Sequence, residues 1–491
     1  MPMEKNKKFR NHISIVAEQI FGGLFAVIVL FAVNFFQDAD DLTRDDLMVV
    51  SDYGIFIFLG VAAVFIIVAI NRLLVWARTY ISIEENAIVI ERNTVNRKKN
   101  TIGIASISNV NMEQNLFEMI MGTCKIKIDI NSRSTADDTD VKIVLKKADA
   151  QAFKKEIMEK MQGAEETKPE AQEEVTFDIH AQLGDIIRHG IYSINILSVI
   201  LLVLGIIGSG VAAVRLLTRP DVIGSLLGMA GAAVVAVSII VSSLWDTLKD
   251  FIRYYDFRAG RKGDRIYICY GLLKTVEYTI PVDKIQALVI RQSLVARIFH
   301  RYKAEIINIG MGDEEEEKNS FLVLYGTEKQ LKEQISLLLP EFLDTVEQKV
   351  DRMPKSAWAA WMVPFLIYLL MVCAAGAVVS GFLGKYTLLI WGCAAGLIVL
   401  VLAGMVLSYL SDGTGIGEDF LKVSNGFFGR EYVAVPYEKI QYVGWKQNFI
   451  ARGLGIQKGK IHLLASGSND VQDVPYFNRE AEDKVRNGML R

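Results

Sequence analysis

Few side chains of this sequence are arranged for catalysis or for binding a metal. The five histidines are His12, His180, His189, His300 and His462. None stands in an HExxH pattern or beside cysteines or carboxylates at metal-ligand spacing. The four cysteines, which form no CxxC pair and which we interpret as packing thiols, are Cys124, Cys269, Cys373 and Cys393. The sequence therefore predicts no catalytic residue, no metal site and no cofactor, and it favours a protein that is not an enzyme.

One glycine-rich stretch resembles a phosphate-binding loop in composition alone. Gly413-Thr-Gly415-Ile-Gly417 does not lie between the strand and helix of a βαβ unit, and no lysine of the Walker type follows it. We interpret it as a flexible exit from the preceding apolar segment. The GxSxG nucleophile motif and the kinase motifs are also absent.

A basic cluster is the one charge feature that suggests a ligand. Arg92, Arg97, Lys98 and Lys99 gather at a predicted hairpin, and near a bilayer each basic residue adds about 1 kcal/mol of attraction to anionic lipid. A lipid-headgroup contact and a merely solvated hairpin both explain the cluster, and both interpretations stay open. Acidic runs at 165–174 and 313–317 are typical of a linker and of a loop between strands.

The elements that must position these residues include six long apolar runs. Hydrophobic residues make up 51% of the 491 residues and charged residues only 22%. The runs are paired, at 14–36 with 55–76, 192–217 with 222–245, and 358–382 with 386–410. Each is long enough for a helix to cross about 30 Å of hydrocarbon, and core helices are rarely so long and so uncharged. We therefore expect an integral membrane protein with three transmembrane hairpins, at 14–76, 191–245 and 358–410.

Charge around these runs predicts their orientation. Basic residues precede the first run and flank the later hairpins, whereas the loop after the first run carries six aspartates and one arginine. Because cytoplasmic loops carry the excess of lysine and arginine, we expect both termini and all polar segments in the cytoplasm, beneath a bacterial plasma membrane. Arg215 and Arg219 at the second outer turn are a mild counter-signal. The net charge of −2 gives no support for nucleic-acid binding.

Three polar segments follow the hairpins and share one set of spacings. An isoleucine precedes a glutamine by seven residues, and a lysine follows that glutamine by eleven. The three sets are Ile107, Gln114 and Lys125; Ile285, Gln292 and Lys303; and Ile440, Gln447 and Lys458. Fourteen residues before each isoleucine lies Asn93, Gly271 or Gly426, which suits the positive φ of a tight hairpin. Eight residues after each glutamine lies Gly122, His300 or Gly455, so we interpret His300 as a turn substitution.

Strand patterns followed by one helical pattern predict a small α+β module in each segment. Residues 80–91 and 265–270 are predicted as first strands, and residues 125–130 alternate with period two. The closing helices are indicated by Phe153, Ile157 and Met161; by Leu331, Ile335 and Leu338; and by Val485 and Met489. The predicted modules cover 77–163, 254–345 and 418–491, with an acidic linker and pre-membrane segment at 164–190.

The motif around the repeat resembles that of a known family. The second copy reads Ile280-Pro281-Val282-Asp283-Lys284-Ile285-Gln286, then Gln292-Ser293-Leu294-Val295-Ala296-Arg297. The third copy keeps Pro436, Ile440, Gln447 and Arg452, whereas the first has Ser106 and Met119 in place of the lysine and arginine. This pattern is similar to the bacterial pleckstrin-homology (PH) domain family (bPH2) of the membrane-attached, YdbS-like kind, and three copies resemble its larger, YdbT-like members. The resemblance implies a seven-stranded sandwich with a C-terminal helix, held at the membrane, and it implies no reaction.

These observations together predict a multi-pass membrane scaffold that presents three cytoplasmic PH-like modules to proteins or lipid headgroups. The resemblance suggests a role in envelope maintenance or in resistance to membrane-active peptides. Expected partners are membrane lipids and a smaller membrane protein with a single such module, and no nucleic acid. A transporter or export component and an anionic-lipid sensor remain as alternatives, although the apolar runs lack the ionisable residues that a transport pathway usually needs.

Overall fold

The computed structural model describes residues 8–37, 44–130, 141–163, 177–194, 248–309, 321–465 and 470–490, and five single positions between 208 and 245. The chain divides into two compact units. The first comprises 1–173 with 273–278, and the second comprises 174–272 with 279–491. Each unit is described by itself below.

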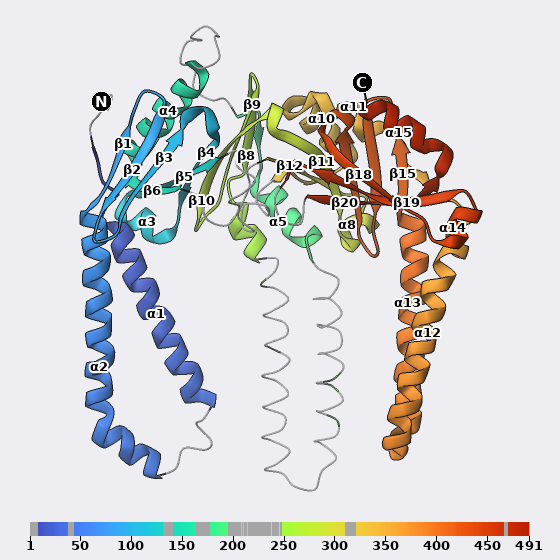
Figure 1. The fold of residues 1–491 in the computed structure, drawn as a ribbon, viewed down its shortest axis with the longest axis horizontal. Helices are drawn as coiled ribbons and strands as arrows, with labels where there is room; N and C mark the ends of the chain where they lie inside the picture. Colours follow the sequence, from blue (N-terminus) through green and yellow to red (C-terminus); the bar gives the residue numbers. More distant parts are fainter. Residues whose placement is uncertain are drawn as a thin grey trace. The chain divides into compact units, whose positions relative to one another are not determined.

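Three helices among the described residues are long and apolar enough to span a membrane. The spans are Leu59–Ala77 in α2 (Arg44–Ala77), Ala357–Phe382, which is α12, and Gly384–Ser411, which includes α13 (Thr387–Ser411). The helix α1 (Ser14–Gln37) contributes a shorter apolar stretch, Ser14–Ala26. Three candidate spans thus stand against the six that the sequence predicted, and the predicted pair at 192–217 and 222–245 lies almost wholly outside the described residues. Figure 1 shows α1 with α2, and α12 with α13, extending from their modules as long helices.

The helix α2 corrects the prediction of an acidic loop between the first two runs. Arg44, Asp45, Asp46 and Asp52 belong to this 34-residue helix, which begins well before the predicted start at 55. Acidic residues in a first turn are favourable because the helix N-terminus carries a partial positive charge, so Asp45 and Asp46 suit the start of α2.

The third module shows how an apolar helical hairpin is inserted into a repeat. Its first strand, β14 (Asp351–Arg352), precedes α12, and its second, β15 (Gly413–Ile416), follows α13. The remaining strands and the closing helix are β16 (Phe420–Asn425), β17 (Arg430–Pro436), β18 (Ile440–Lys446), β19 (Ile456–Leu463), β20 (Val471–Asn478) and α15 (Glu482–Met489). The hairpin of α12 and α13 is therefore an insertion between the first and second strands of a seven-stranded module.

The glycine-rich stretch forms the strand β15 and is not a flexible exit. The third module therefore starts at β14, before α12, and not at the predicted residue 418. A Cβ on Gly413 would lie 2.4 Å from the carbonyl oxygen of Asp351, and one on Gly415 would lie 2.5 Å from that of Lys349. The glycines are needed because the chain of residues 349–351 passes directly over them.

In their described residues, the other two modules follow the same order of strands and closing helix. In the second, β7 (Ile179–His180) and α5 (Leu183–Tyr192) precede the undescribed pair, so the predicted linker at 164–190 contains part of the module. Its later elements are β8 (Arg258–Lys262), β9 (Arg265–Tyr270), β10 (Thr275–Pro281), β11 (Ile285–Gln292), α8 (Leu294–Ile298), β12 (Tyr302–Asn308), β13 (Phe321–Gly326), α10 (Glu328–Leu338) and α11 (Leu343–Glu347). In the first, an isolated bridge from Phe9 to Ile81 stands in place of the short first strand.

The strands of the first module correct one further prediction. Residues 80–91 form two strands, not one, because the chain turns at Glu85, and Glu84 donates its N–H to the carbonyl oxygen of Ala87. The elements are β1 (Thr79–Ile83), β2 (Ala87–Asn93), β3 (Arg97–Gly103), β4 (Ile107–Gln114), α3 (Leu116–Met121), β5 (Thr123–Ile130), β6 (Val141–Lys146) and α4 (Lys147–Gly163).

The closing helices cover the cores as the spacing predicted. Phe153 and Ile157 on α4 are fully buried against Ile126 and Ile143 of the sheet. Leu331, Ile335 and Leu338 on α10 are buried, as is Val485 on α15. Burying a side chain of this size stabilises the fold by about 1.5–3 kcal/mol, so one apolar stripe on each helix fixes its position on the sheet.

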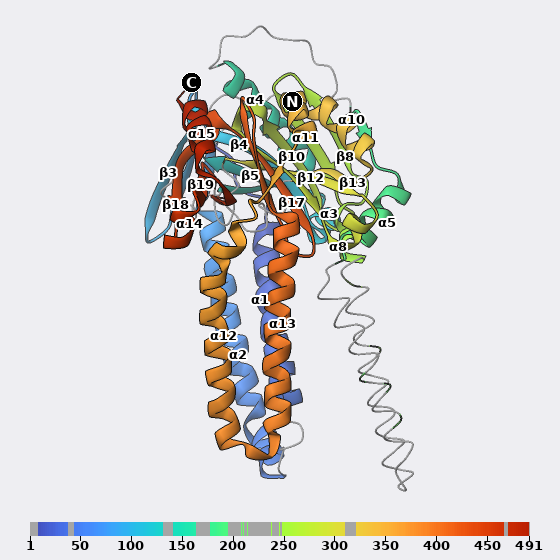
Figure 2. The same cartoon turned by 90° about the vertical axis from the view of Figure 1, so that its right-hand side faces the viewer.

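The sheets extend beyond single modules. In the second unit the strand order is β13-β12-β11-β17-β16-β15-β14, with β18-β19-β20 as a separate sheet. In the first unit β1-β2-β3 form one sheet, and β6-β5-β4 continue into the first residues of β10. Figure 2 shows β17 and β18 of the third module above its helices α12 and α13. A strand of one module thus pairs with a strand of the next.

Candidate interaction site at the module junctions

The strands that form the junctions are connected by the same short turn in every repeat. β3, β10 and β17 end at Gly103, Pro281 and Pro436, and each is followed by one 3-10 turn. The next strand then begins at Ile107, Ile285 or Ile440, all of which are buried. The turns are Ile104–Ser106, Val282–Lys284 and Tyr437–Lys439. The isoleucines of the repeat are core residues that anchor the start of β4, β11 and β18.

The glutamines of the repeat fix the other end of these strands. Gln114, Gln292 and Gln447 each donate a side-chain N–H to the backbone carbonyl oxygen nine residues later, at 2.7, 3.0 and 3.1 Å. The residue after each glutamine is the N-cap of a short helix, α3, α8 or α14 (Phe449–Gly453). Because one side chain spans that helix, its two ends are held together, and the spacing follows from this closure.

The turn after each short helix explains the third spacing that the repeats share. Gly122 and Gly455 have φ of 65°, and His300 has φ of 50° in the same left-handed conformation. The tight-hairpin prediction holds only for Gly271, with φ of 116°, since neither Asn93 nor Gly426 has positive φ. At Gly426 glycine is required because a Cβ would lie 2.4 Å from the carbonyl oxygen of Gly429.

The junction between the second and third modules is an antiparallel strand pair with a charged centre. β11 pairs with β17 from Leu288 opposite Ala434 to Gln292 opposite Arg430. Arg291 lies opposite Glu431, with Nε 3.1 Å from Oε2, and its Nη1 lies 3.1 Å from Oε2 of Glu305 on β12. Burial opposes ionisation of Glu305, but Lys303 and Arg291 lower its pKa below the ordinary range. Arg291 therefore holds two carboxylates from two different modules.

The junction in the first unit has the same register and the opposite charge. β10 pairs with β4 through Thr275 opposite Gln114 and Val276 opposite Glu113. The Glu113 carboxylate forms ion pairs with Nζ of Lys127 on β5 at 3.2 Å and with Nζ of Lys274, beside β10, at 3.2 Å. Here one carboxylate holds two lysines. Thr275 and Arg430 are the first residues of equivalent strands. In both junctions the residue before the repeat glutamine, Glu113 or Arg291, therefore lies opposite the second residue of the incoming strand.

The equivalent strand of the third module has one open edge. β18 pairs with β19 only, among the residues that the structure describes. Its side chains are largely exposed or half-buried, whereas those of β11 are buried apart from Arg291. Lys446 occupies the position of Glu113 and Arg291 and is exposed.

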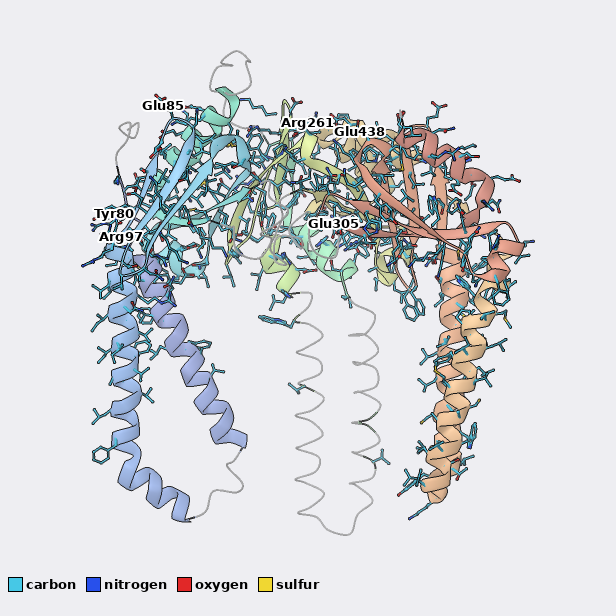
Figure 3. The ribbon with its side chains drawn as sticks, in the orientation of Figure 1. Tyr80, Glu85, Arg97, Arg261, Glu305 and Glu438 are labelled. Atoms are coloured by element: carbon cyan, nitrogen blue, oxygen red, sulfur yellow. The ribbon has the colours of Figure 1, made fainter. Side chains whose placement is uncertain are left out.

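The basic cluster lies at the end of its module from which α2 extends. Arg92, Arg97, Lys98 and Lys99 are all exposed on the β2–β3 hairpin, and Arg92 lies directly opposite Lys98. The hairpin is held beside the end of α2, because Asn93 donates its N–H to the carbonyl oxygen of Arg78 at 2.9 Å. Figure 3 shows Arg97 and Tyr80 near α2 and Glu85 at the far end of the module. Lys99 forms an ion pair with Glu91 at 3.6 Å.

Comparison with known proteins matches all three repeats to one family. The family model described as "Bacterial PH domain" matches residues 27–161, 196–336 and 365–491. The chain belongs to the bacterial PH domain family. It is also 23% identical over 434 residues to the UPF0699 transmembrane protein YdbT of Bacillus subtilis (strain 168), which covers 84% of this chain and 83% of the relative. No solved structure matches the chain significantly.

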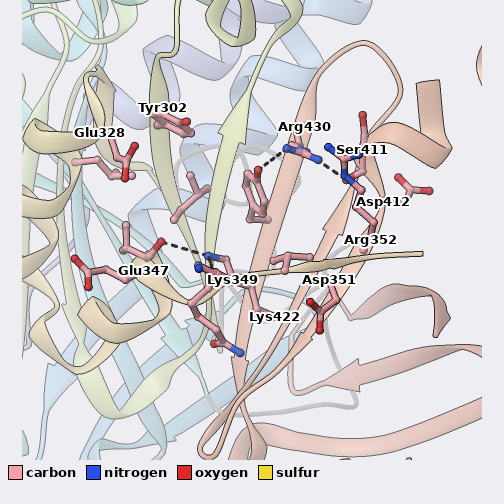
Figure 4. A pocket seen from close by; sticks show the side chains of 17 residues that line it. Tyr302, Glu328, Glu347, Lys349, Asp351, Arg352, Ser411, Asp412, Lys422 and Arg430 are labelled. Atoms are coloured by element: carbon pink, nitrogen blue, oxygen red, sulfur yellow. Dashed lines mark hydrogen bonds between the residues drawn. The ribbon is translucent and has the colours of Figure 1, made fainter. Parts of the chain in front are cut away.

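A polar cavity of about 270 Å³ lies where the second and third PH modules meet. Lys422 on β16 lines it together with Arg430 and Tyr432 of β17 (Figure 4). The Lys422 ammonium group donates to the carbonyl oxygens of Thr345 at 2.6 Å and Gln348 at 3.0 Å, and it lies 3.5 Å from that of Val346. Burial lowers the pKa of Lys422 to about 8.

Lys422 is therefore a structural cap more than a nucleophile. The carbonyl groups at the C-terminal end of α11 have no helical partner, and a cation there satisfies them and the helix dipole. Its N–H groups are taken up by these acceptors, so the amine is not presented to the cavity for attack on a substrate.

The remaining repeat residues hold structural contacts. Lys125 pairs with Glu118 at 3.4 Å, and Lys303 pairs with Glu305 at 2.7 Å. Arg297 donates to the hydroxyl of Ser411 at 2.9 Å, and Lys458 lies 5.4 Å from the ring centre of Tyr476. Arg452 on α14 is exposed. No group of three metal-ligating side chains occurs within the described ranges, and Cys124 and Cys269 are buried.

Sequence reasoning missed the junction residues Glu113, Arg291 and Glu431. The signal was present, because the residue before the glutamine of each repeat is charged, as Glu113, Arg291 and Lys446. The repeat does not show which strand pairs with β4 or β11, because that depends on how neighbouring PH modules join.

Proposed function

We propose that this chain is a membrane-anchored scaffold whose PH modules bind other proteins through their sheet edges. The observation that supports it best is the pairing of β11 with β17, in which one PH module binds the next along a strand with a matched ion pair. Exposed sheet edges are a recurrent mode of protein recognition. Several modules on one anchor give avidity for a multivalent partner.

We place all three modules in the cytoplasm beneath six membrane helices. The lysine and arginine distribution supports this orientation. It predicts that Lys385→Cys, in the exposed turn between α12 and α13, reacts with a membrane-impermeant maleimide in intact spheroplasts, whereas Lys484→Cys on α15 does not. If only the Lys484→Cys variant were labelled, the modules would lie on the outer side of the membrane. The unmodified chain, with its own four cysteines, is the control.

The scaffold role is tested by cross-linking in intact membranes at native expression level. A lysine-reactive cross-linker is expected to join peptides of the PH modules to peptides of another membrane protein. Cross-links that stay within one chain under these conditions would contradict a scaffold role.

Anionic-lipid sensing is a second candidate, supported by the cross-strand pair of Arg92 and Lys98. Like charges directly opposite each other are destabilising unless an anion lies between them. Val95 at the tip of the same hairpin is fully exposed, as an interfacial anchor would be. A fluorophore on Val95→Cys should shift to shorter wavelength in nanodiscs with phosphatidylglycerol compared with phosphatidylcholine alone. Arg92→Ala with Lys98→Ala should abolish that difference, and a difference that persists would exclude the role.

A further inference from the structure

The open edge of β18 is the third copy of a surface that is occupied twice within the chain. β4 and β11 carry β10 and β17 on this edge, and both pairs share one register. In each pair, the residue before the repeat glutamine lies opposite the second residue of the incoming strand: Glu113 lies opposite Val276, and Arg291 lies opposite Glu431. The strand β18 presents the same edge with its side chains still exposed.

The charge at that point differs between the three copies. Glu113 is matched by Lys274 from the incoming side, and Arg291 is matched by Glu431. The corresponding Lys446 has no carboxylate partner among the described residues. Two lysines on β19 lie near it, since Lys458 lies opposite Lys446 and Lys460 lies two pairs further along. Lys460 is only partly compensated, by Asp473 at 3.7 Å. An incoming strand would therefore need an acidic residue at this point.

A second copy of this chain does not meet that need. Among the described residues, the one equivalent strand with an unpaired second edge is β3, which pairs with β2 only and starts at Arg97 as β17 starts at Arg430. In the shared register Lys98 would lie opposite Lys446, and Lys99 opposite Trp445. Like charges directly across a strand pair are destabilising, and lysine on an edge strand is a common device against unwanted pairing. Since head-to-tail pairing of copies would give open filaments, this repulsion keeps the chains apart.

We propose that the β18 edge is the docking site for the edge strand of a PH module in another protein, with an acidic residue opposite Lys446 in the place that Glu431 takes opposite Arg291. This inference rests on the scaffold role and assigns it to one strand. The incoming strand runs antiparallel to β18, and its first residue lies opposite Gln447. The ion pair with Lys446 selects this partner against another copy of the chain.

The test uses the chain itself as the probe, by giving β3 the acidic residue that a partner would supply. The full-length Lys98→Glu chain carries a PH edge strand with a carboxylate in register for Lys446 of another copy. The variant Lys446→Glu creates the same pair with the charges reversed. Both residues are exposed, so neither change disturbs a core. The double variant places two glutamates opposite each other, and Lys484→Glu on α15 is a control with the same change in charge.

Light scattering after size-exclusion chromatography in detergent measures the number of chains in each particle. We expect one chain for the unmodified protein, the double variant and the control, and two or more chains for each single variant. Single variants that remain at one chain, association of the unmodified protein, or equal association of the control would each overturn the assignment. If the assignment fails while the modules still cross-link to another membrane protein, the scaffold role stands and its site lies elsewhere.

Discussion

Arg291 of the second PH module lies opposite Glu431 of the third, with its Nε 3.1 Å from the Glu431 carboxylate. The same guanidinium reaches Glu305 of its own module at 3.1 Å. One arginine thus joins the two modules at the centre of a continuous sheet.

Reversal of this arginine should weaken the junction. Arg291→Glu places a third carboxylate beside Glu305 and Glu431, and we expect it to lower the free energy of unfolding by about 2–3 kcal/mol. Glu431→Arg in the same chain should recover part of the loss, because it restores an opposite charge across the strands. Thermal unfolding of the full chain in detergent measures both. Equal stability of the single and double variants would show that the pair does not couple the modules.

Lys422 should contribute to stability through the end of α11. Lys422→Met leaves carbonyl oxygens of Thr345 and Gln348 without their donor, and we expect a loss of about 1–3 kcal/mol. Lys460→Met, at a half-exposed lysine on β19, should change stability by less than about 0.5 kcal/mol.

The stability contribution of Lys422 should also depend on pH. Its pKa of about 8 lies below the value of about 10.4 for an unfolded lysine. The unfolded chain therefore binds the extra proton in this range, and stability should rise with pH between these values. The methionine variant should lack that rise, and an identical pH profile would contradict the assignment.

His189 on α5 should make the second module sensitive to acid. Burial lowers the pKa of His189 well below its usual value, and its Nδ1 accepts the N–H of Tyr325 at 3.1 Å. Below about pH 6.5 the unfolded chain gains a proton that the folded chain refuses, so stability should fall as the pH falls. His189→Gln should reduce the difference in unfolding temperature between pH 7.5 and 5.5. An unchanged difference in the His189→Gln variant would contradict this role of His189.

His300 should be replaceable by glycine with a gain in stability. Its φ of 50° is left-handed, where the Cβ of an L-residue is strained by about 1–2 kcal/mol. Glycine loses more conformational entropy on folding, and this cost offsets part of the relieved strain. His300→Gly should therefore raise the free energy of unfolding by about 0.5–1 kcal/mol. Gly122→Ala and Gly455→Ala at the equivalent turns should lower it by about 1 kcal/mol. Destabilisation by His300→Gly would mean that the imidazole has a role beyond the turn.

The sequence predicted the repeat well because its spacings arise from local closure. The glutamine that spans each short helix acts within nine residues, and the helix stripes of Phe153, Leu331 and Val485 follow from a period that a sequence displays. The turn at Glu85 escaped detection because apolar residues flank it on both sides and mimic one long strand.

The parts that were missed depend on contacts between distant residues. Gly413 and Gly415 are glycine because residues 349–351 pass over them, and those residues lie before the membrane hairpin in sequence. The pairing of β11 with β17 joins residues about 140 positions apart, and Arg291 by itself is one charged residue among many. No local pattern distinguishes such a residue from a solvated one.

We propose that the open edge of β18 binds the edge strand of a PH module in another protein. A photoreactive amino acid in place of Tyr442, which is exposed on β18, tests it in living cells. We predict a cross-link from position 442 to a strand of another membrane protein, and a marked loss of that cross-link when Lys446→Glu is added. Cross-links only within the chain, or a yield that Lys446→Glu leaves unchanged, would contradict it.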